Sequence, residues 1–132
     1  MSEVIREVQI QAAPETVYSY FTDPEKLISW VGIEAHLEPY PRGRFEVTVN
    51  HERKIIGEYL ELIPYSRIVI SWGWEGREDV PPGSSTVEIT LTLNAKGTLV
   101  HLRHYNLPEG ATPLHAKSWE HNLPHLKKSL EA

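Results

Sequence analysis

Cysteine is absent from the 132 residues of this chain. Its absence excludes disulfide bonds, thiolate metal sites and a cysteine nucleophile, and it is compatible with the reducing cytosol. Apolar runs are also short, and none approaches the roughly 20 residues that a membrane-spanning helix needs. The N-terminal segment MSEVIREVQI contains acidic residues and lacks the apolar stretch of a secretory signal. We therefore expect a cytoplasmic protein without a membrane span.

Basic residues are also fewer than acidic ones. Lys and Arg total 13 against 18 Asp and Glu, which leaves a formal net charge of -5 with histidine neutral. Such an acidic balance argues against a surface that binds nucleic acid non-specifically, so we expect no nucleic-acid partner. The basic residues in the middle of the chain are dispersed over predicted turns among acidic ones, which is typical of a solvated surface: Arg42, Arg44, Arg53, Lys54 and Arg67.

Motifs that carry familiar catalytic or cofactor chemistry are missing. The sequence has no serine nucleophile elbow, no HExxH zinc motif and no glycine-rich phosphate loop. His121 and His125 have the spacing of two ligands on one helix face, but no third ligand is evident and Pro124 disturbs the geometry between them. We therefore expect no metal site, no cofactor and no defined catalytic residue.

Repeats, low-complexity segments and linkers are absent too. With 40% hydrophobic and 23% charged residues, the composition is that of an ordinary globular protein. A length of 132 residues suits one domain with one core, so we expect a single domain over residues 1–132, as a monomer or a homodimer.

The strongest pattern in the chain is an apolar stripe within residues 112–132. Its members are separated by three, four, three and four positions, which is the spacing of one helix face: Ala116, Trp119, Leu123, Leu126 and Leu130. Charged residues fall mostly off this stripe. We predict a long C-terminal helix packed on an apolar surface, with a kink at Pro124, because proline removes a backbone hydrogen bond from a helix interior.

The segments before this helix alternate with a period of two, apart from two short helical stretches. A strand over residues 4–10 is followed by predicted helices over residues 14–21 and 24–32. Six further strands follow within residues 33–106, and the short turns between them imply antiparallel hairpins. The predicted fold class is therefore α+β: a curved antiparallel sheet of six or seven strands wrapped around the C-terminal helix.

Alternation also predicts which side chains face the helix. In four strands a run of alternate residues is mostly apolar, and we expect these runs on the concave face of the sheet. The expected inward residues are Phe45, Val47, Val49 and His51; Ile56, Glu58, Leu60 and Leu62; Ile68, Ile70, Trp72 and Trp74; and Val100, Leu102, His104 and Asn106. A bulge or a one-residue slip in register would move Glu58 to the outer face.

The order of short motifs along the chain resembles a known protein family. The motifs are APETVY at 13–18, TDPEKL at 22–27 with Trp30, PRGRF at 41–45, GEY at 57–59, WGWEG at 72–76, VPPGS at 80–84, GT at 97–98, His104, Leu107-Pro108, His115 and Trp119. Together they are similar to the START-like (SRPBCC) superfamily, and within it to the group named for the activator of the heat-shock-protein-90 ATPase, in its free-standing bacterial form. The resemblance covers nearly the whole chain and implies the helix-grip, Bet v-like fold.

The resemblance implies a cavity between sheet and helix that binds a hydrophobic small molecule, aromatic or lipid-like. Two alternatives remain open: a polyketide-cyclase or hydrolase type of enzyme using a cavity histidine, and a module that stimulates a chaperone ATPase. Eukaryotic activators resembling this family use an additional N-terminal domain, which we do not expect within 132 residues. Ser118 replaces the usual glycine and Tyr18 the usual tryptophan of the family pattern, and we expect both to border the cavity.

Polar and aromatic residues around the expected cavity are the candidate ligand contacts: Trp30, His51, Glu58, Trp72, Trp74, His104, His115 and Trp119. Each tryptophan has core packing as its alternative role, since one buried indole removes roughly 150–250 Å² of surface from water. We favour core packing for Trp72 and Trp119, and a place at the cavity mouth for Trp74. His104 is either a core histidine with bonded ring nitrogens or a polar anchor for a ligand, and it is also the strongest candidate for a catalytic base.

Overall fold

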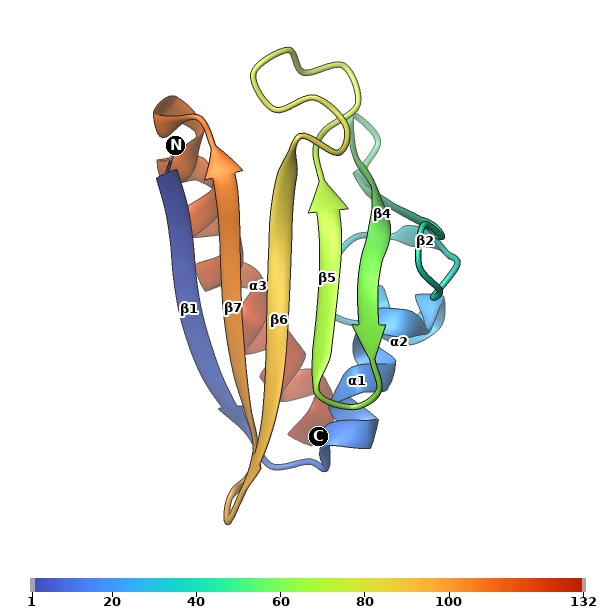
Figure 1. Cartoon of the computed structure of the whole chain (residues 1–132), viewed down its shortest axis with the longest axis vertical. Coiled ribbons are helices and arrows are strands. Elements are labelled where there is room, and N and C mark those ends of the chain that lie inside the picture. Colours follow the sequence, from blue (N-terminus) through green and yellow to red (C-terminus); the bar gives the residue numbers. More distant parts are fainter. Residues whose placement is uncertain (1, 132) are drawn as a thin grey trace.

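Seven antiparallel strands form a curved sheet in the computed structural model, which describes residues 2–131 (Figure 1). The strands are β1 (Ser2–Ile10), β2 (Glu34–Leu37), β3 (Arg44–Asn50), β4 (Arg53–Ile63), β5 (Arg67–Trp72), β6 (Ser85–Asn94) and β7 (Gly97–Leu107). Their order across the sheet is β1-β7-β6-β5-β4-β3-β2, so β1 pairs with the last strand while the others follow the order of the chain. The predicted antiparallel sheet is confirmed.

Four helical elements complete the fold. They are α1 (Pro14–Thr22), α2 (Pro24–Leu27), the 3-10 turn η1 (Glu109–Ala111) and α3 (Thr112–Glu131). Asp23 separates the first two helices, because its Oδ1 accepts hydrogen bonds from the backbone N–H groups of Glu25 at 2.9 Å and Lys26 at 3.3 Å. Gly32 then turns the chain into β2 with a φ of 76°, a left-handed conformation that glycine adopts without a steric penalty.

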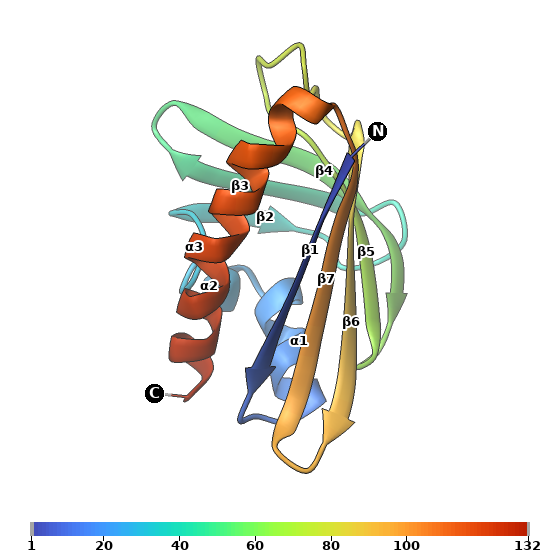
Figure 2. The ribbon, with the colours of Figure 1, turned by 90° about the vertical axis from the view of Figure 1, so that its left-hand side faces the viewer.

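Helix α3 lies against the concave side of the sheet, next to β1 (Figure 2). It buries His115, Trp119, Leu123 and Leu126, while Ala116 and Leu130 are partly buried against the core, so the predicted stripe is confirmed and His115 joins it. Burial of each large apolar side chain contributes about 1.5–3 kcal/mol to folding. The helix continues through Pro124, which lies on its exposed side.

Polar contacts also hold α3 in place. The Nζ of Lys127 donates to the backbone carbonyl of Gln9 at 2.6 Å, and Arg6 forms an ion pair with Glu120 at 2.8 Å. Both contacts join the helix to β1, and they supplement the apolar stripe that faces the sheet. Within residues 2–131, no helix is both long enough and apolar enough to span a membrane.

Strand β4 bends sharply, so that the β2–β3 end of the sheet crosses over α3 (Figure 2). Its first half pairs with β3 as far as Glu58, and its second half pairs with β5 from Tyr59 onwards. Gly57 lies at the bend, where an added Cβ would be 1.7 Å from the backbone oxygen of Ser71. Glycine is therefore required for this close approach of two backbones. The bend gives the sheet the curvature that leaves space beneath it.

The predicted inner face of β4 is wrong. Ile55 and Tyr59 are buried beneath the sheet, whereas Glu58 and Leu60 are exposed on the outer face. A shift in register between Tyr59 and Glu61 marks an extra residue in the strand, after which Leu62 packs against the core. A bulge shifts the alternation of faces by one residue. If alternation is counted back from Leu62 without the bulge, the residues before Tyr59 are assigned to the wrong face of the sheet.

Two strand ends also differ from the prediction. The side-chain oxygen of Asn50 accepts from the backbone N–H of Glu52 at 2.9 Å and closes a tight turn, which leaves His51 exposed rather than inward. At the end of β7, Asn106 adopts a φ of 64° and is exposed, and Leu107 takes the buried position. In both places the strand stops alternating before the predicted inward residue.

Candidate ligand-binding cavity

A cavity of about 190 Å³ lies between the concave face of the sheet and helix α3. Its wall is mostly apolar and includes all four tryptophans of the chain. The lining residues are Phe21, Leu27, Trp30, Val31, Phe45, Val49, Arg53, Ile55, Ile70, Trp72, Trp74, Ile89, His115, Ser118, Trp119, His121 and Asn122. The predicted candidates Trp30, Trp72, Trp74, His115 and Trp119 are therefore brought together around one space.

Aromatic rings support one another around this space. The ring centroid of Trp72 lies 5.4 Å from that of Phe45 and 5.3 Å from that of Trp119. On the side of α1 and α2, Phe21 and Trp30 meet at 5.3 Å in an edge-to-face arrangement. Such pairs contribute about 0.5–1.5 kcal/mol each beyond the area they bury, so the wall is preformed by its own packing.

The indole N–H groups of the four tryptophans differ in their hydrogen bonding. Trp30 donates to the carbonyl of Tyr20 at 3.1 Å, while Trp74 and Trp119 donate to histidine nitrogens. Within residues 2–131, no acceptor pairs with the N–H of Trp72, and no fully buried side-chain nitrogen or oxygen lacks a partner. Trp72 is only 7% exposed and lines the cavity, and it is the one tryptophan of residues 2–131 whose N–H has no acceptor within the protein.

His104 is buried behind the wall and does not line the cavity. The N–H of Trp119 donates to its Nδ1 at 3.1 Å, so Nδ1 is the unprotonated nitrogen and Nε2 carries the proton. That Nε2–H donates to the Oγ of Ser85 at 2.8 Å, and the Ser85 hydroxyl donates to the carbonyl of Trp72 at 2.6 Å. Of the two predicted roles, His104 therefore has the geometry of a core histidine with both ring nitrogens bonded.

The contact between Ser85 and His104 resembles that of a nucleophile and its base, but the donor and acceptor of the hydrogen bond are reversed. A catalytic base must accept the serine proton, whereas Nε2 of His104 donates to this serine because its other nitrogen accepts from Trp119. Ser85 is also fully buried and outside the cavity lining. The pair therefore lacks both the proton order and the access that nucleophilic catalysis requires.

His115 does line the cavity, again with both ring nitrogens bonded. Its Nε2 accepts the indole N–H of Trp74 at 2.9 Å, and its Nδ1–H donates to the carbonyl of Ala111 at 2.8 Å. Burial lowers the pKa of His115, which the hydrogen bond to Ala111 partly offsets. His115 is thus a neutral bridge between Trp74 and the 3-10 turn η1 that precedes α3.

Arg53 stands at the cavity mouth, although its sequence context predicts a solvated turn. Its guanidinium lies 4.7 Å from the ring centroid of Trp74, in a cation–π contact. Arg53 is the first residue of β4 and lies an even number of positions before Ile55 and Tyr59, so it shares their face of the strand. Once the inner face of β4 is known, this spacing predicts that Arg53 faces the cavity. From α3, Ser118, His121 and Asn122 complete the lining, while Lys117 is exposed.

The remaining predicted residues lie elsewhere. Glu58 and His51 are exposed and do not line the cavity, for the bulge and turn described above. Ser118 borders the cavity as expected, but Tyr18 packs edge-to-face on Tyr65 with ring centroids 5.4 Å apart. The rings of His121 and His125 lie 4.8 Å apart, and residues 2–131 contain no group of three side chains able to hold a metal ion.

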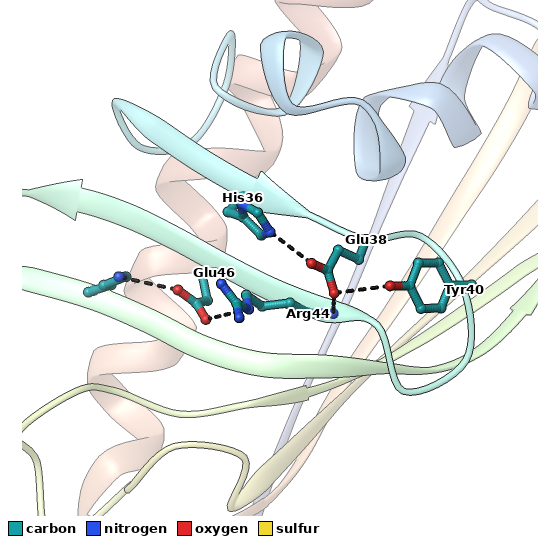
Figure 3. Close-up of polar contacts among 6 residues, drawn as sticks. His36, Glu38, Tyr40, Arg44 and Glu46 are labelled. Carbon is teal, nitrogen blue, oxygen red and sulfur yellow. Dashed lines mark hydrogen bonds and ion pairs between the residues drawn. The ribbon is translucent and has the colours of Figure 1, made fainter.

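A second polar cluster lies on the surface, at the β2–β3 edge (Figure 3). Glu38 is its centre and contacts His36 at 2.9 Å, the backbone N–H of Arg44 at 3.2 Å and the hydroxyl of Tyr40 at 3.2 Å. These donors, His36 foremost, lower the pKa of the Glu38 carboxyl to about 2. Because these three donors come from β2, from the loop and from the start of β3, their bonds to Glu38 hold the turn between the two strands in place.

Comparison with known proteins places the chain among relatives of the same fold. Residues 11–131 match the family model described as activator of Hsp90 ATPase homolog 1-like protein. An AHSA1-like protein from Rhizobium etli is 40% identical, with a TM-score of 0.77 over 98% of this chain and 82% of that one. The CalU16 protein from Micromonospora echinospora is 30% identical, with a TM-score of 0.78 over 95% of this chain and 71% of that one.

More distant structures share the fold. The Aha1 dimer from Colwellia psychrerythraea is 20% identical, with a TM-score of 0.87 over 99% of this chain and 97% of that one. No curated protein matches the sequence. The family match over most of the chain and the helix-grip architecture agree with the motifs from APETVY to Trp119. The chain therefore belongs to the AHSA1-like family of the START-like superfamily.

Proposed function

We propose that this protein binds a small hydrophobic molecule in the cavity between the sheet and α3. The observation that carries the proposal is a space of about 190 Å³ inside a wall of tryptophan, phenylalanine and aliphatic side chains. Ligand sites of this kind are mostly apolar with a few placed polar groups, and Arg53, Ser118 and Asn122 supply such groups here.

The hydrogen bonds of the two buried histidines, His104 and His115, favour binding over catalysis by either of them. A general base needs a free nitrogen within reach of the substrate. Both ring nitrogens of His104 and His115 are bonded within the protein, and His104 does not reach the cavity. Activation of a chaperone ATPase, which the family description names, stays a prediction that a direct ATPase stimulation assay tests.

Intrinsic fluorescence is the natural measurement of binding, because all four tryptophans line the cavity. Titration with toluene as an aromatic probe and n-octanol as a lipid-like probe is expected to change the emission in a saturable way. Native mass spectrometry of freshly purified protein then asks whether a compound of a few hundred daltons is carried along. The absence of saturable binding for every aromatic and aliphatic probe would count against the proposal.

A variant that fills the cavity provides a sharper test. Ser118→Phe is expected to weaken binding of either probe at least tenfold, since its ring would occupy part of the space that Ser118 borders. Lys117→Phe is the matched control, because its side chain is exposed one position away on the same helix. Calorimetry should show both variants melting within a few degrees of the wild type. Unchanged affinity in folded Ser118→Phe would place the ligand elsewhere.

A further inference from the structure

The size and the polar groups of the cavity narrow the class of its ligand. We infer that the ligand is a single-ring aromatic molecule with one anionic acceptor group, such as a carboxylate, that lies against Arg53 at the mouth. This inference rests on the proposed function and adds to it a ring size, a charge and the residue that recognises the charge.

Volume limits the apolar part of the ligand. An engineered apolar cavity of about 150 Å³ binds one benzene, and pockets that bind drug-sized ligands measure about 300–1,000 Å³. At about 190 Å³, the present cavity is only slightly larger than the benzene site. This space matches one six-membered ring with a small substituent, whereas a long acyl chain or a multi-ring skeleton would extend out of it through the mouth.

The wall favours a flat, aromatic ring. Trp72 lies between Phe45 and Trp119, with interplanar angles of 33° and 45°, and presents an indole surface to the cavity. Its N–H is also the tryptophan donor that has no acceptor among residues 2–131. A ring that stacks here and carries an oxygen would therefore find a free donor beside it.

Carboxylates of residues 2–131 are absent from the cavity lining, although acidic residues lie near its mouth. The cavity lining includes Arg53 and no aspartate or glutamate. Among residues 2–131, no ion pair involves Arg53: its acidic neighbours Glu52 and Glu75 share a separate surface hollow with it but form no salt bridge. The contact with Trp74 is a cation–π contact, and among residues 2–131 no hydrogen bond or ion pair engages the Arg53 guanidinium, so its N–H donors are available to a carboxylate.

Neighbouring cations do not offer the same opportunity. Lys54, the next residue, forms an ion pair with Glu46 at 3.2 Å. Arg77 is held by two hydrogen bonds to Asp79. Arg53 is therefore the guanidinium at this end of the molecule that combines a place at the cavity mouth with an uncommitted charge.

The test compares benzoate with benzamide, which has nearly the same shape and no charge. At pH 7.5 and low salt, wild-type protein is expected to bind benzoate at least tenfold more tightly than benzamide, by tryptophan fluorescence or calorimetry. In Arg53→Gln, we expect this preference to fall below threefold while the affinity for benzamide changes less than threefold. Arg53→Lys should retain part of the preference, because it keeps the charge without the planar donors.

Lys54→Gln is the matched control, because it removes the same charge from the adjacent residue and leaves the cavity lining intact. It should bind both probes within twofold of the wild type. Equal binding of benzoate and benzamide by the wild type would overturn the inference that the ligand is anionic and would leave the proposed function standing. Binding of toluene or n-octanol without binding of benzoate would overturn it in the same way. Failure of all four probes would instead contradict the proposed function itself.

Discussion

Replacing His104 with alanine is expected to lower the free energy of unfolding by about 3–5 kcal/mol, because the change removes packing and two hydrogen bonds at once. The side chain is fully buried, so the variant would leave a void under β7. The N–H of Trp119 would lose its acceptor and the Oγ of Ser85 would lose a donor. A buried donor without a partner alone costs about 1–3 kcal/mol.

His101→Ala is the matched control for this variant. His101 lies three residues earlier on β7, is partly exposed, and is expected to change stability by no more than about 0.5 kcal/mol. Urea denaturation followed by tryptophan fluorescence measures both variants. Equal, small effects at the two positions would mean that the hydrogen-bonded chain from Trp119 to Trp72 does not stabilise the core.

Acid is expected to destabilise the folded protein well above the pH at which most carboxylates titrate. Burial, and secondarily the nearby His115, lowers the pKa of His104 from 6.5 to about 3. Between these two pH values the unfolded chain binds a proton that the folded chain does not. The stability is therefore fully present above pH 6.5 and is lost progressively as the pH falls towards 3.

The size of this effect follows from the shift. Each pH unit below 6.5 costs about 1.4 kcal/mol per buried neutral histidine, so His104 alone accounts for a loss of about 2 kcal/mol at pH 5. His115, whose pKa is also lowered by burial, adds to the slope in the same direction. Its ring lies 5.0 Å from that of His104, so a proton on either ring disfavours a proton on the other.

Urea midpoints at several pH values between 7.5 and 5 test this expectation. His115→Gln serves as the companion variant, because an amide oxygen can accept from Trp74 while the amide nitrogen donates to Ala111. Its loss of stability over this range should be smaller than that of the wild type. A wild-type stability that stays constant from pH 6.5 to 5 would contradict the buried, neutral state of both histidines.

Much of the architecture follows from local patterns in the sequence. The spacing of Trp119, Leu123 and Leu126 repeats every three or four residues over a long segment, and the amphipathic helix α3 follows from it. The short turns between successive strands permit antiparallel pairing and little else. Proline and aspartate around Asp23 place the boundary between α1 and α2, since their effects on the backbone act over a few residues.

The make-up of the cavity was predicted in part. Trp30, Trp72, Trp74 and Trp119 lie around one space, because their side chains share the inner face of the sheet or face it from α3 and from the turn after α2. Glu58 and His51 were misplaced because a bulge and a tight turn each end a period-two pattern without a strong mark in the sequence. The same bulge in β4 concealed that Arg53 shares its strand face with Ile55 and Tyr59.

By itself, then, the sequence determined the family, the strand and helix order and the aromatic character of the interior, because these depend on composition and on neighbours a few positions apart. Only the tertiary structure decided that both buried histidines are neutral, that the N–H of Trp72 is free and that Arg53 stands at the mouth. Each of these properties depends on partners far apart in the chain, such as His104 with Ser85 or Arg53 with Trp74. Such pairs form only once strand register and helix docking have brought them within a few ångströms.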